Sequence, residues 1–187
     1  MLFRSPSAFV IKRQIRIWAH SKALGELSDL PKVQEVIETM MSARWPVSAR
    51  YHLSSGFGDR YHPILKRRRF HSGVDIAIPT GTPIQAALDG KVQTASFDNV
   101  NGNYVVLGHG DGLNTIYCHA SKLLVKEDDA VKQGEIFARS GSTGRSTGPH
   151  LHFGMRIGRS WVDPAMIYTV SGVKLDLGPL VDATPAK

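Results

Sequence analysis

The sequence has a single cysteine, no long apolar run and no recognisable leader. Cys118 is the only cysteine among 187 residues, so no intrachain disulfide can support the fold. No run of about 18 apolar residues occurs, and no membrane-spanning helix is predicted. The apolar block at residues 8–11 is shorter than a signal-peptide core of about 7–15 residues. We therefore expect either an export route that this sequence does not show or a fragment of a longer chain.

Composition and charge are those of a folded protein with a basic surface. Apolar residues make up 42% and charged residues 21%, which excludes a wholly disordered or fibrous chain. The formal net charge of +7 favours a polyanionic partner such as nucleic acid, a cell wall or an acidic membrane surface. The basic run at residues 66–69 has no aromatic stacking array or reading helix beside it. We interpret it as a solvated loop that at most steers substrate, and we expect no nucleic-acid binding.

An amphipathic helix is predicted over residues 31–42. The apolar positions follow the i, i+3, i+4, i+7, i+8 spacing that places them on one stripe: Val33, Val36, Ile37, Met40 and Met41. Pro31 suits the first turn of this helix and Pro46 limits its far end. We expect the stripe to pack on the following domain or on a partner. Residues 1–49 are therefore interpreted as a partly helical N-terminal extension.

From about Trp45 onward, short β-branched and aromatic segments alternate with turn residues. The expected strands are Gly73 to Ile78, Gly90 to Phe97, Tyr104 to Leu107, Leu113 to His119, Glu135 to Arg139 and His150 to Ile157. Turn signals rich in Gly, Pro, Asn and Asp lie between them. This pattern predicts a mainly β fold with a small antiparallel β domain at residues 50–168. Residues 169–187 are expected to form a loose tail.

Histidines carry most of the candidate chemistry of this β domain. Because side chains alternate between the two faces of a strand, His150 and His152 point to the same side. The same alternation places His71 and Asp75 on one face, with only Gly73 between them to obstruct a metal. Imidazole and carboxylate groups are suitable ligands for zinc, and a catalytic zinc commonly keeps three protein ligands.

A third strand adds another imidazole. Alternation along residues 115–119 predicts that His119 shares a face with Thr115 and Tyr117, and that Cys118 lies on the opposite face. Taken alone, each histidine is more often a structural or surface residue than a ligand. Their combination on three strands beside tight turns favours a metal site, although the residues by themselves leave both interpretations open.

Four stretches resemble the lysostaphin-type (LytM-like) zinc endopeptidases of bacterial cell walls. They are SSGFGDRYHP at 54–63, HSGVDIAIPTGTPIQAALDGKV at 71–92, GNYVVLGHGDGLNTIYCHAS at 102–121 and GSTGRSTGPHLHF at 141–153. The likeness runs from about Arg50 to Ala165 and is highly specific, because the four blocks agree in the family's order. It implies the family fold, a small barrel-like antiparallel β domain of duplicated hybrid motif type, with the site in a groove on one sheet.

The resemblance also implies a division of labour among the key residues. The family's zinc ligands correspond to His71, Asp75 and His152, which implies one Zn²⁺ per chain. Its two catalytic histidines that do not bind the metal correspond to His119 and His150. Because no H-E-x-x-H motif occurs, no zincin-type glutamate is available as a base, and these two histidines are expected to move the protons.

Further positions match the family without a settled role. Arg60, Asn103 and Tyr104 match positions near the groove, where they would either bind substrate or fix loops. His62 belongs to a loop beside the groove, and we favour a structural hydrogen bond for it. His109 is interpreted as a turn or packing residue. The departures are Cys118 for a small residue, Gly154 for an acidic one, and Met155-Arg156 for an aliphatic continuation, and they leave the five key positions intact.

The resemblance implies a zinc-dependent endopeptidase that hydrolyses peptide crosslinks or stem peptides of peptidoglycan. We expect a bond of the D-Ala to diaminopimelate type, with a pentaglycine bridge as the other possibility. Such a substrate implies an extracytoplasmic location, in the periplasm, in the cell envelope or outside the cell. The alternative is a catalytically silent wall-binding or hydrolase-activating module of the same fold, and the intact ligand set speaks against it. The sequence does not indicate an oligomeric state.

Overall fold

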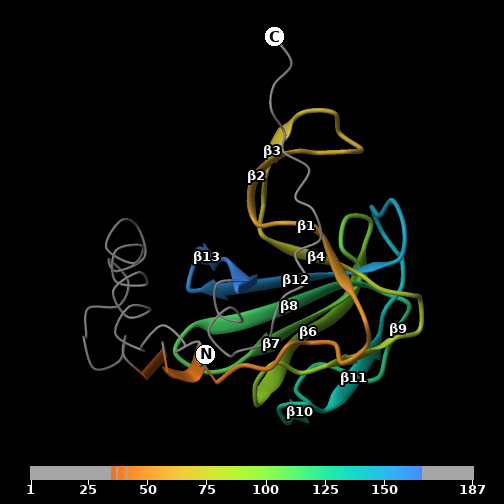
Figure 1. The fold of residues 1–187 in the computed structure, drawn as a ribbon. Helices are drawn as coiled ribbons and strands as arrows, with labels where there is room; N and C mark the ends of the chain where they lie inside the picture. Colours follow the sequence, from red (N-terminus) through yellow and green to blue (C-terminus); the bar gives the residue numbers. More distant parts are fainter. Residues whose placement is uncertain (1–34, 37, 41, 166–187) are drawn as a thin grey trace, which may run out of the picture.

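The protein is mainly antiparallel β structure, as predicted. The computed structural model describes residues 35–36, 38–40 and 42–165, and Figure 1 shows a curved main sheet with smaller sheets beside it. The main sheet has eight strands in the order β1-β4-β12-β8-β7-β6-β10, with β13 paired to β12. Their bounds are β1 His52–Ser55, β4 Gly73–Ala77, β6 Gly90–Asp98, β7 Gly102–Gly108, β8 Leu113–Ala120, β10 Ala130–Val131, β12 His150–Ile157 and β13 Ser160–Val162.

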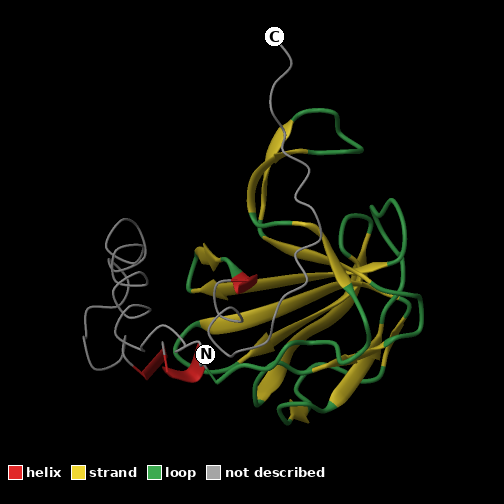
Figure 2. Cartoon of the chain, in the orientation of Figure 1, coloured by secondary structure: helices red, strands yellow, loops and turns green. Residues whose placement is uncertain are grey.

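Two smaller sheets complete the described fold. One has three strands in the order β5-β11-β9, with bounds β5 Pro83–Gln85, β9 Lys122–Leu123 and β11 Ile136–Arg139. The other is a hairpin of β2 (Gly58–Tyr61) and β3 (Arg68–His71). This hairpin projects away from the main sheet next to β1 and β4 (Figure 1). Strands dominate the described chain, and helical residues are few (Figure 2).

The six expected strands correspond to β4, β6, β7, β8, β11 and β12, with bounds that differ by at most two residues. The strands missed by the sequence analysis are short or polar. β9 and β10 have two residues each. The hairpin strands read GDRY and RRFH, so neither offers the alternation of apolar and polar residues by which a half-buried strand is recognised.

The hydrophobic core lies on one side of the main sheet. Tyr117, Phe137 and Phe153 are almost fully buried and meet there, with ring centroids 4.8 Å apart for Tyr117 and Phe137 and 5.2 Å for Tyr117 and Phe153. Phe137 comes from the three-stranded sheet, so aromatic packing joins that sheet to β8 and β12. On β12, Leu151 and Phe153 face this core, which leaves the opposite face of the strand to polar side chains.

The segment before the first strand also packs into this core. Residues 35–36 and 38–40 are helical and lie within the predicted helix 31–42. Val36 and Met40 from its apolar stripe are buried in the core cluster, together with Trp45 and Val47. The other stripe residues, Val33, Ile37 and Met41, lie outside the described residues, as do residues 1–34 and 166–187, which include the predicted tail at 169–187. Within the described chain, no helix has the length and apolar character needed to cross a membrane.

Two glycines allow β4 and β12 to approach each other closely. Gly73 and Gly154 are register partners in the antiparallel ladder. A Cβ atom added at Gly73 would lie 2.3 Å from the carbonyl oxygen of Phe153, closer than real Cβ atoms come. From the sequence alone, Gly73 is expected to leave space for a metal. The structure gives a different reason for a glycine, because the position is filled by the backbone of β12.

We predict that Gly73→Ala destabilises the domain. The added methyl group must push two central strands apart, which corresponds to a loss of about 1–3 kcal/mol in the free energy of unfolding. Equilibrium unfolding in urea measures this change. Gly56→Ala is the matched control, since a Cβ there meets nothing within 4 Å, and we expect a change below about 0.5 kcal/mol. Equal stability of the two variants would contradict the close approach.

Candidate metal centre

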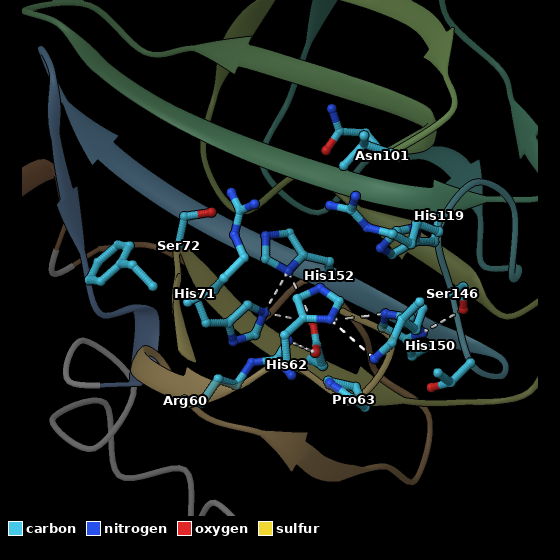
Figure 3. A pocket seen from close by; sticks show the side chains of 17 residues that line it. Arg60, His62, Pro63, His71, Ser72, Asn101, His119, Ser146, His150 and His152 are labelled. Atoms are coloured by element: carbon cyan, nitrogen blue, oxygen red, sulfur yellow. Dashed lines mark hydrogen bonds and ion pairs between the residues drawn. The ribbon is translucent and has the colours of Figure 1, made fainter. Parts of the chain in front are cut away.

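Three neighbouring strands bring two histidines and an aspartate to one point. Asp75 of β4 and His152 of β12 are register partners in the main sheet, so their side chains lie side by side on the same face. His71 is the last residue of β3 and enters from the projecting hairpin. Figure 3 shows His71 and His152 pointing toward each other inside the cavity.

The three side chains meet in an almost equilateral triangle of two ring nitrogens and one carboxylate oxygen. His71 Nε2 lies 3.1 Å from Asp75 Oδ1 and 3.0 Å from His152 Nδ1, and His152 Nδ1 lies 3.0 Å from Asp75 Oδ1. The Nδ1 of His71 is 2.6 Å from the carbonyl oxygen of Gly56, so it must donate its proton there. A neutral His71 therefore keeps a lone pair on the nitrogen that faces the other two residues.

This triangle fits a metal ion. Bonds of about 2.0 Å in a tetrahedral zinc site separate the ligand atoms by about 3.3 Å, close to the distances in the triangle. Among the residues that the structure describes, these three form the group of His, Cys, Asp or Glu side chains with the reach to hold a metal: His71, Asp75 and His152. Two imidazoles and one carboxylate are the donors that zinc favours in catalytic sites.

Arg60 fixes the aspartate in this arrangement. Its Nη2 donates to Asp75 Oδ2 at 3.1 Å, which leaves Oδ1 for the two histidines. Burial raises the pKa of Asp75, but the two histidines beside it, His152 and His71, outweigh burial and hold this pKa well below its usual range. The carboxylate is therefore ionised, as a metal ligand must be. Arg60 also lines the cavity, so it lies beside the groove as the sequence analysis expected.

His119 and His150 lie next to the triangle with their tautomers set by the backbone. His119 Nδ1 is 2.8 Å from the Thr143 carbonyl oxygen, and His150 Nδ1 is 2.8 Å from the Gly148 carbonyl oxygen. Because a carbonyl only accepts, both Nδ1 atoms donate, and in a neutral ring Nε2 then carries the lone pair. The two rings are 4.6 Å apart, and His150 Nε2 is 3.8 Å from Asp75 Oδ1. Burial lowers the pKa of His119 to about 4, so this ring is neutral at pH 7.

The predicted alternation along β8 is wrong at its end. Tyr117 is in the core, and its hydroxyl lies 3.0 Å from that of Thr115, so these two residues share the core face. His119 instead lies on the metal-site face. Cys118 is the register partner of His152 and lies on that face too, not on the opposite one. Its thiol is buried, and burial raises its pKa far above the ordinary value, which makes it an inert packing group.

A β-bulge causes this reversal. The pairing of β8 with β7 shifts between Asn103 and Val105, so two residues of β8 oppose one residue of β7. His119 has a φ of +67°, a left-handed conformation that turns its side chain to the other face. Its backbone N–H leaves the ladder and donates to the Asn101 carbonyl oxygen at 2.8 Å. No local sequence feature indicates this bulge, so strand periodicity could not have found it.

The five histidine and aspartate side chains open into one cavity (Figure 3). One wall comes from the β2–β3 hairpin, and the other from residues 100–101 and 145–147. His62 is part of the hairpin wall, and its Nδ1 accepts hydrogen bonds from the backbone N–H groups of Ile64 and Leu65, both at 3.2 Å. His109 lies outside the lining, where it bridges the Asp89 carbonyl and the Thr115 hydroxyl at 2.7 Å each.

Asn103 and Tyr104 do not join this cavity. Neither belongs to its lining, and the Asn103 amide instead donates to the Ala120 carbonyl at 2.9 Å. The Thr143 hydroxyl donates to the same carbonyl at 2.8 Å and accepts from the Asn103 backbone N–H at 3.0 Å. These bonds attach the loop around Thr143, whose carbonyl accepts from His119, to β7. Thr143 was missed by the sequence analysis, since its contacts join segments far apart in the chain.

Three side chains able to hold a metal, flanked by two further histidines in a groove of an antiparallel sheet, point to a metallopeptidase. The chain belongs to this class through one particular family, peptidase family M23, whose model matches residues 69–164, about half of the chain. The peptidoglycan DD-endopeptidase ShyA of Vibrio cholerae is 45% identical over 111 residues, which cover 59% of this chain and 26% of ShyA. The chain spans about a quarter of the length of the curated relatives it matches.

Solved structures agree with this assignment. A zinc-containing peptidase from Vibrio cholerae is 41% identical with a TM-score of 0.61, covering 65% of this chain and 38% of that one. The catalytic domain of lysostaphin, an antimicrobial peptidase from Staphylococcus simulans, is 38% identical with a TM-score of 0.57, covering 62% of this chain and 90% of that one. The fold expected from the sequence is therefore confirmed.

We predict that Asn103→Ala lowers stability and leaves substrate affinity unchanged. The variant loses the hydrogen bond to the Ala120 carbonyl, which corresponds to about 1 kcal/mol in the free energy of unfolding. Urea unfolding measures the loss, and the KM for a cleavable peptide measures affinity. An unchanged free energy of unfolding with a raised KM would instead make Asn103 a substrate contact.

Proposed function

We propose that this chain is a zinc-dependent peptidoglycan endopeptidase. The observation that carries the proposal is the triangle formed by His71, Asp75 and His152 beside two histidines whose Nδ1 atoms are held by backbone carbonyls. In this proposal His71, Asp75 and His152 hold one zinc ion, and His119 and His150 act on the substrate. A catalytically silent module of the same fold would need neither the complete donor set nor two histidines with matched tautomers.

The chemistry divides between the metal and the two histidines. When bound, zinc supplies a Lewis acid that polarises a peptide carbonyl and lowers the pKa of water. Each Nε2 lone pair of His119 and His150 can accept the proton of the attacking water. The protonated ring then carries the proton to the leaving amine. The Thr143 and Gly148 carbonyls keep the rings oriented throughout, because they bind the Nδ1–H groups, which do not take part.

The site also contains its own positioning group. Arg60 holds Asp75 Oδ2, so the carboxylate cannot rotate away from the two histidines. The burial of Asp75 and His71 keeps bulk water from competing for these polar groups. Residues that orient a metal ligand in this way commonly affect metal affinity by about 10- to 100-fold.

The substrate bond in this proposal is the peptide crosslink between D-alanine and diaminopimelate. The support is similarity to ShyA, which is named a peptidoglycan DD-endopeptidase. Acting on peptidoglycan requires an extracytoplasmic location, so we infer that the chain works in the periplasm, in the cell envelope or outside the cell.

The test is digestion of purified sacculi by the zinc-loaded protein, with mass spectrometry of the released peptides. We expect crosslinked dimers to be converted to monomers, and a chelator to stop the conversion. Masses that place the new termini at D-alanine and diaminopimelate would support the proposed bond. Intact dimers after prolonged incubation with zinc-loaded, folded protein would refute the endopeptidase proposal.

We predict that His71→Ala and Asp75→Ala each remove bound zinc and hydrolysis together. Each variant loses one of three donors, and a site with two donors binds zinc too weakly to retain it during purification. Zinc content by elemental mass spectrometry and dimer hydrolysis are the two measurements. His109→Gln is the control, because this histidine lies outside the cavity and should leave zinc content unchanged.

We predict a different outcome for His119→Ala and His150→Ala, which should keep their zinc and lose turnover. Removing a general acid or base costs about 10²- to 10⁴-fold in rate. The kcat for a soluble crosslinked peptide, compared with zinc content per chain, separates this loss from metal loss. Near-normal turnover in His150→Ala, or loss of its zinc, would show that the assigned roles are wrong.

A further inference from the structure

The metal-site cavity contains more positive charge than its catalytic residues require. Arg60 and Arg69 are register partners on the β2–β3 hairpin, and both line the cavity. Arg145 lines it from the opposite wall. All three arginines contribute to lowering the pKa of His62, after its burial, so their charges are concentrated around one point of the groove.

Negative charge in this cavity is scarce. Asp75 is the one carboxylate in its lining, and it is already bound by Arg60. Within the described chain, the side chains of Arg69 and Arg145 make no hydrogen bond or ion pair. Elsewhere basic side chains pair with carboxylates: Lys91 with Asp128, Lys126 with Asp129 and Lys132 with Asp89.

Folding gives no reason for this arrangement. Like charges at directly opposite positions of an antiparallel pair are destabilising, as Arg60 and Arg69 are here. Arg145 is partly buried, so its guanidinium has lost some hydration without gaining a partner. A bound anion would reduce the repulsion between Arg60 and Arg69 and would give the Arg145 guanidinium a partner. Arg68, one residue before Arg69, lies outside the lining, so the basic run as a whole is not turned toward the cavity.

The same walls carry exposed apolar side chains. Ile64 and Phe70 of the hairpin are 41% and 51% exposed, and Val100 on the opposite wall is 44% exposed, and all three line the cavity. A ligand that suits these walls has small apolar groups and at least one carboxylate. A peptide of alanine and a diamino diacid has this chemistry, whereas a glycine bridge has neither a side chain nor an internal carboxylate.

We propose that Arg69 and Arg145 form a carboxylate-binding subsite that selects crosslinks with a free carboxylate beside the scissile bond. The subsite rests on the proposed endopeptidase function and narrows its substrate to acidic peptides. Arg69 and Arg145 bind the substrate carboxylate from opposite walls, while Arg60 stays with Asp75. The guanidinium fork matches a carboxylate in geometry as well as charge.

The test compares two synthetic crosslinked peptides that differ at one group. In the first peptide, the diaminopimelate carboxylate on the carbon that bears the acylated amine is free. In the second peptide, this carboxylate is a carboxamide. We expect zinc-loaded wild-type protein to prefer the free acid by about tenfold in kcat/KM, mainly through KM. Arg69→Gln and Arg145→Gln should each reduce this ratio to about threefold or less, and added salt should weaken the preference of the wild type.

Arg68→Gln is the matched control, because it removes the same charge from the same hairpin outside the cavity and should keep the tenfold ratio. Circular dichroism and zinc content confirm that each variant is folded and loaded. Equal cleavage of both peptides by the wild type would overturn the subsite while leaving the endopeptidase function intact. An equal fall of the ratio in Arg68→Gln and Arg69→Gln would also overturn it, since long-range charge would then explain the preference.

A binding measurement separates the subsite from the proposed function. Fluorescence anisotropy with labelled peptides and metal-depleted protein reports affinity without turnover. If neither peptide is cleaved, the endopeptidase proposal fails. Tighter binding of the free acid, lost in Arg69→Gln and Arg145→Gln, then still supports a carboxylate subsite, and equal binding of both peptides refutes it.

Discussion

The structure depends on how closely β4 and β12 lie side by side. Gly73 and Gly154 let the two backbones approach without intervening side chains, and two residues away on each strand Asp75 and His152 are register partners. A slip of one residue in this register would turn either side chain to the other face of the sheet. The polar face of the sheet is therefore set by the same ladder that buries Phe153 in the core.

Carbonyl groups of loop residues determine which ring nitrogen of the histidines carries the proton. Backbone carbonyls of Gly56, Thr143 and Gly148 each accept from an Nδ1–H group, on His71, His119 and His150 respectively. The same kind of contact gives each of the three rings the same tautomer when neutral, with the proton on Nδ1 and the Nε2 atom directed to the site. A carbonyl cannot donate, so it fixes the proton more firmly than a hydroxyl would.

Much of the fold and part of the site were predictable from the sequence. Apolar alternation located β12 and the shared face of His150 and His152, because period-two patterns reflect burial directly. The β2–β3 hairpin was not predicted, since its strands are polar, and strand alternation wrongly placed His119 on the face of Thr115 and Tyr117. A bulge depends on the register with a neighbouring strand, and the carbonyl contacts depend on loops brought together by folding, so neither leaves a periodic signal in the chain.

The hairpin has one further consequence for how such a protein can diversify. β3 ends at His71, and the base of the hairpin is held by the pairing of Gly58 with His71. The turn at residues 62–67 lies at the far end, so insertions or deletions there change the height of the outer wall and leave the anchored end in place. The depth of the groove can therefore change at this turn without moving the histidine at the base of the hairpin.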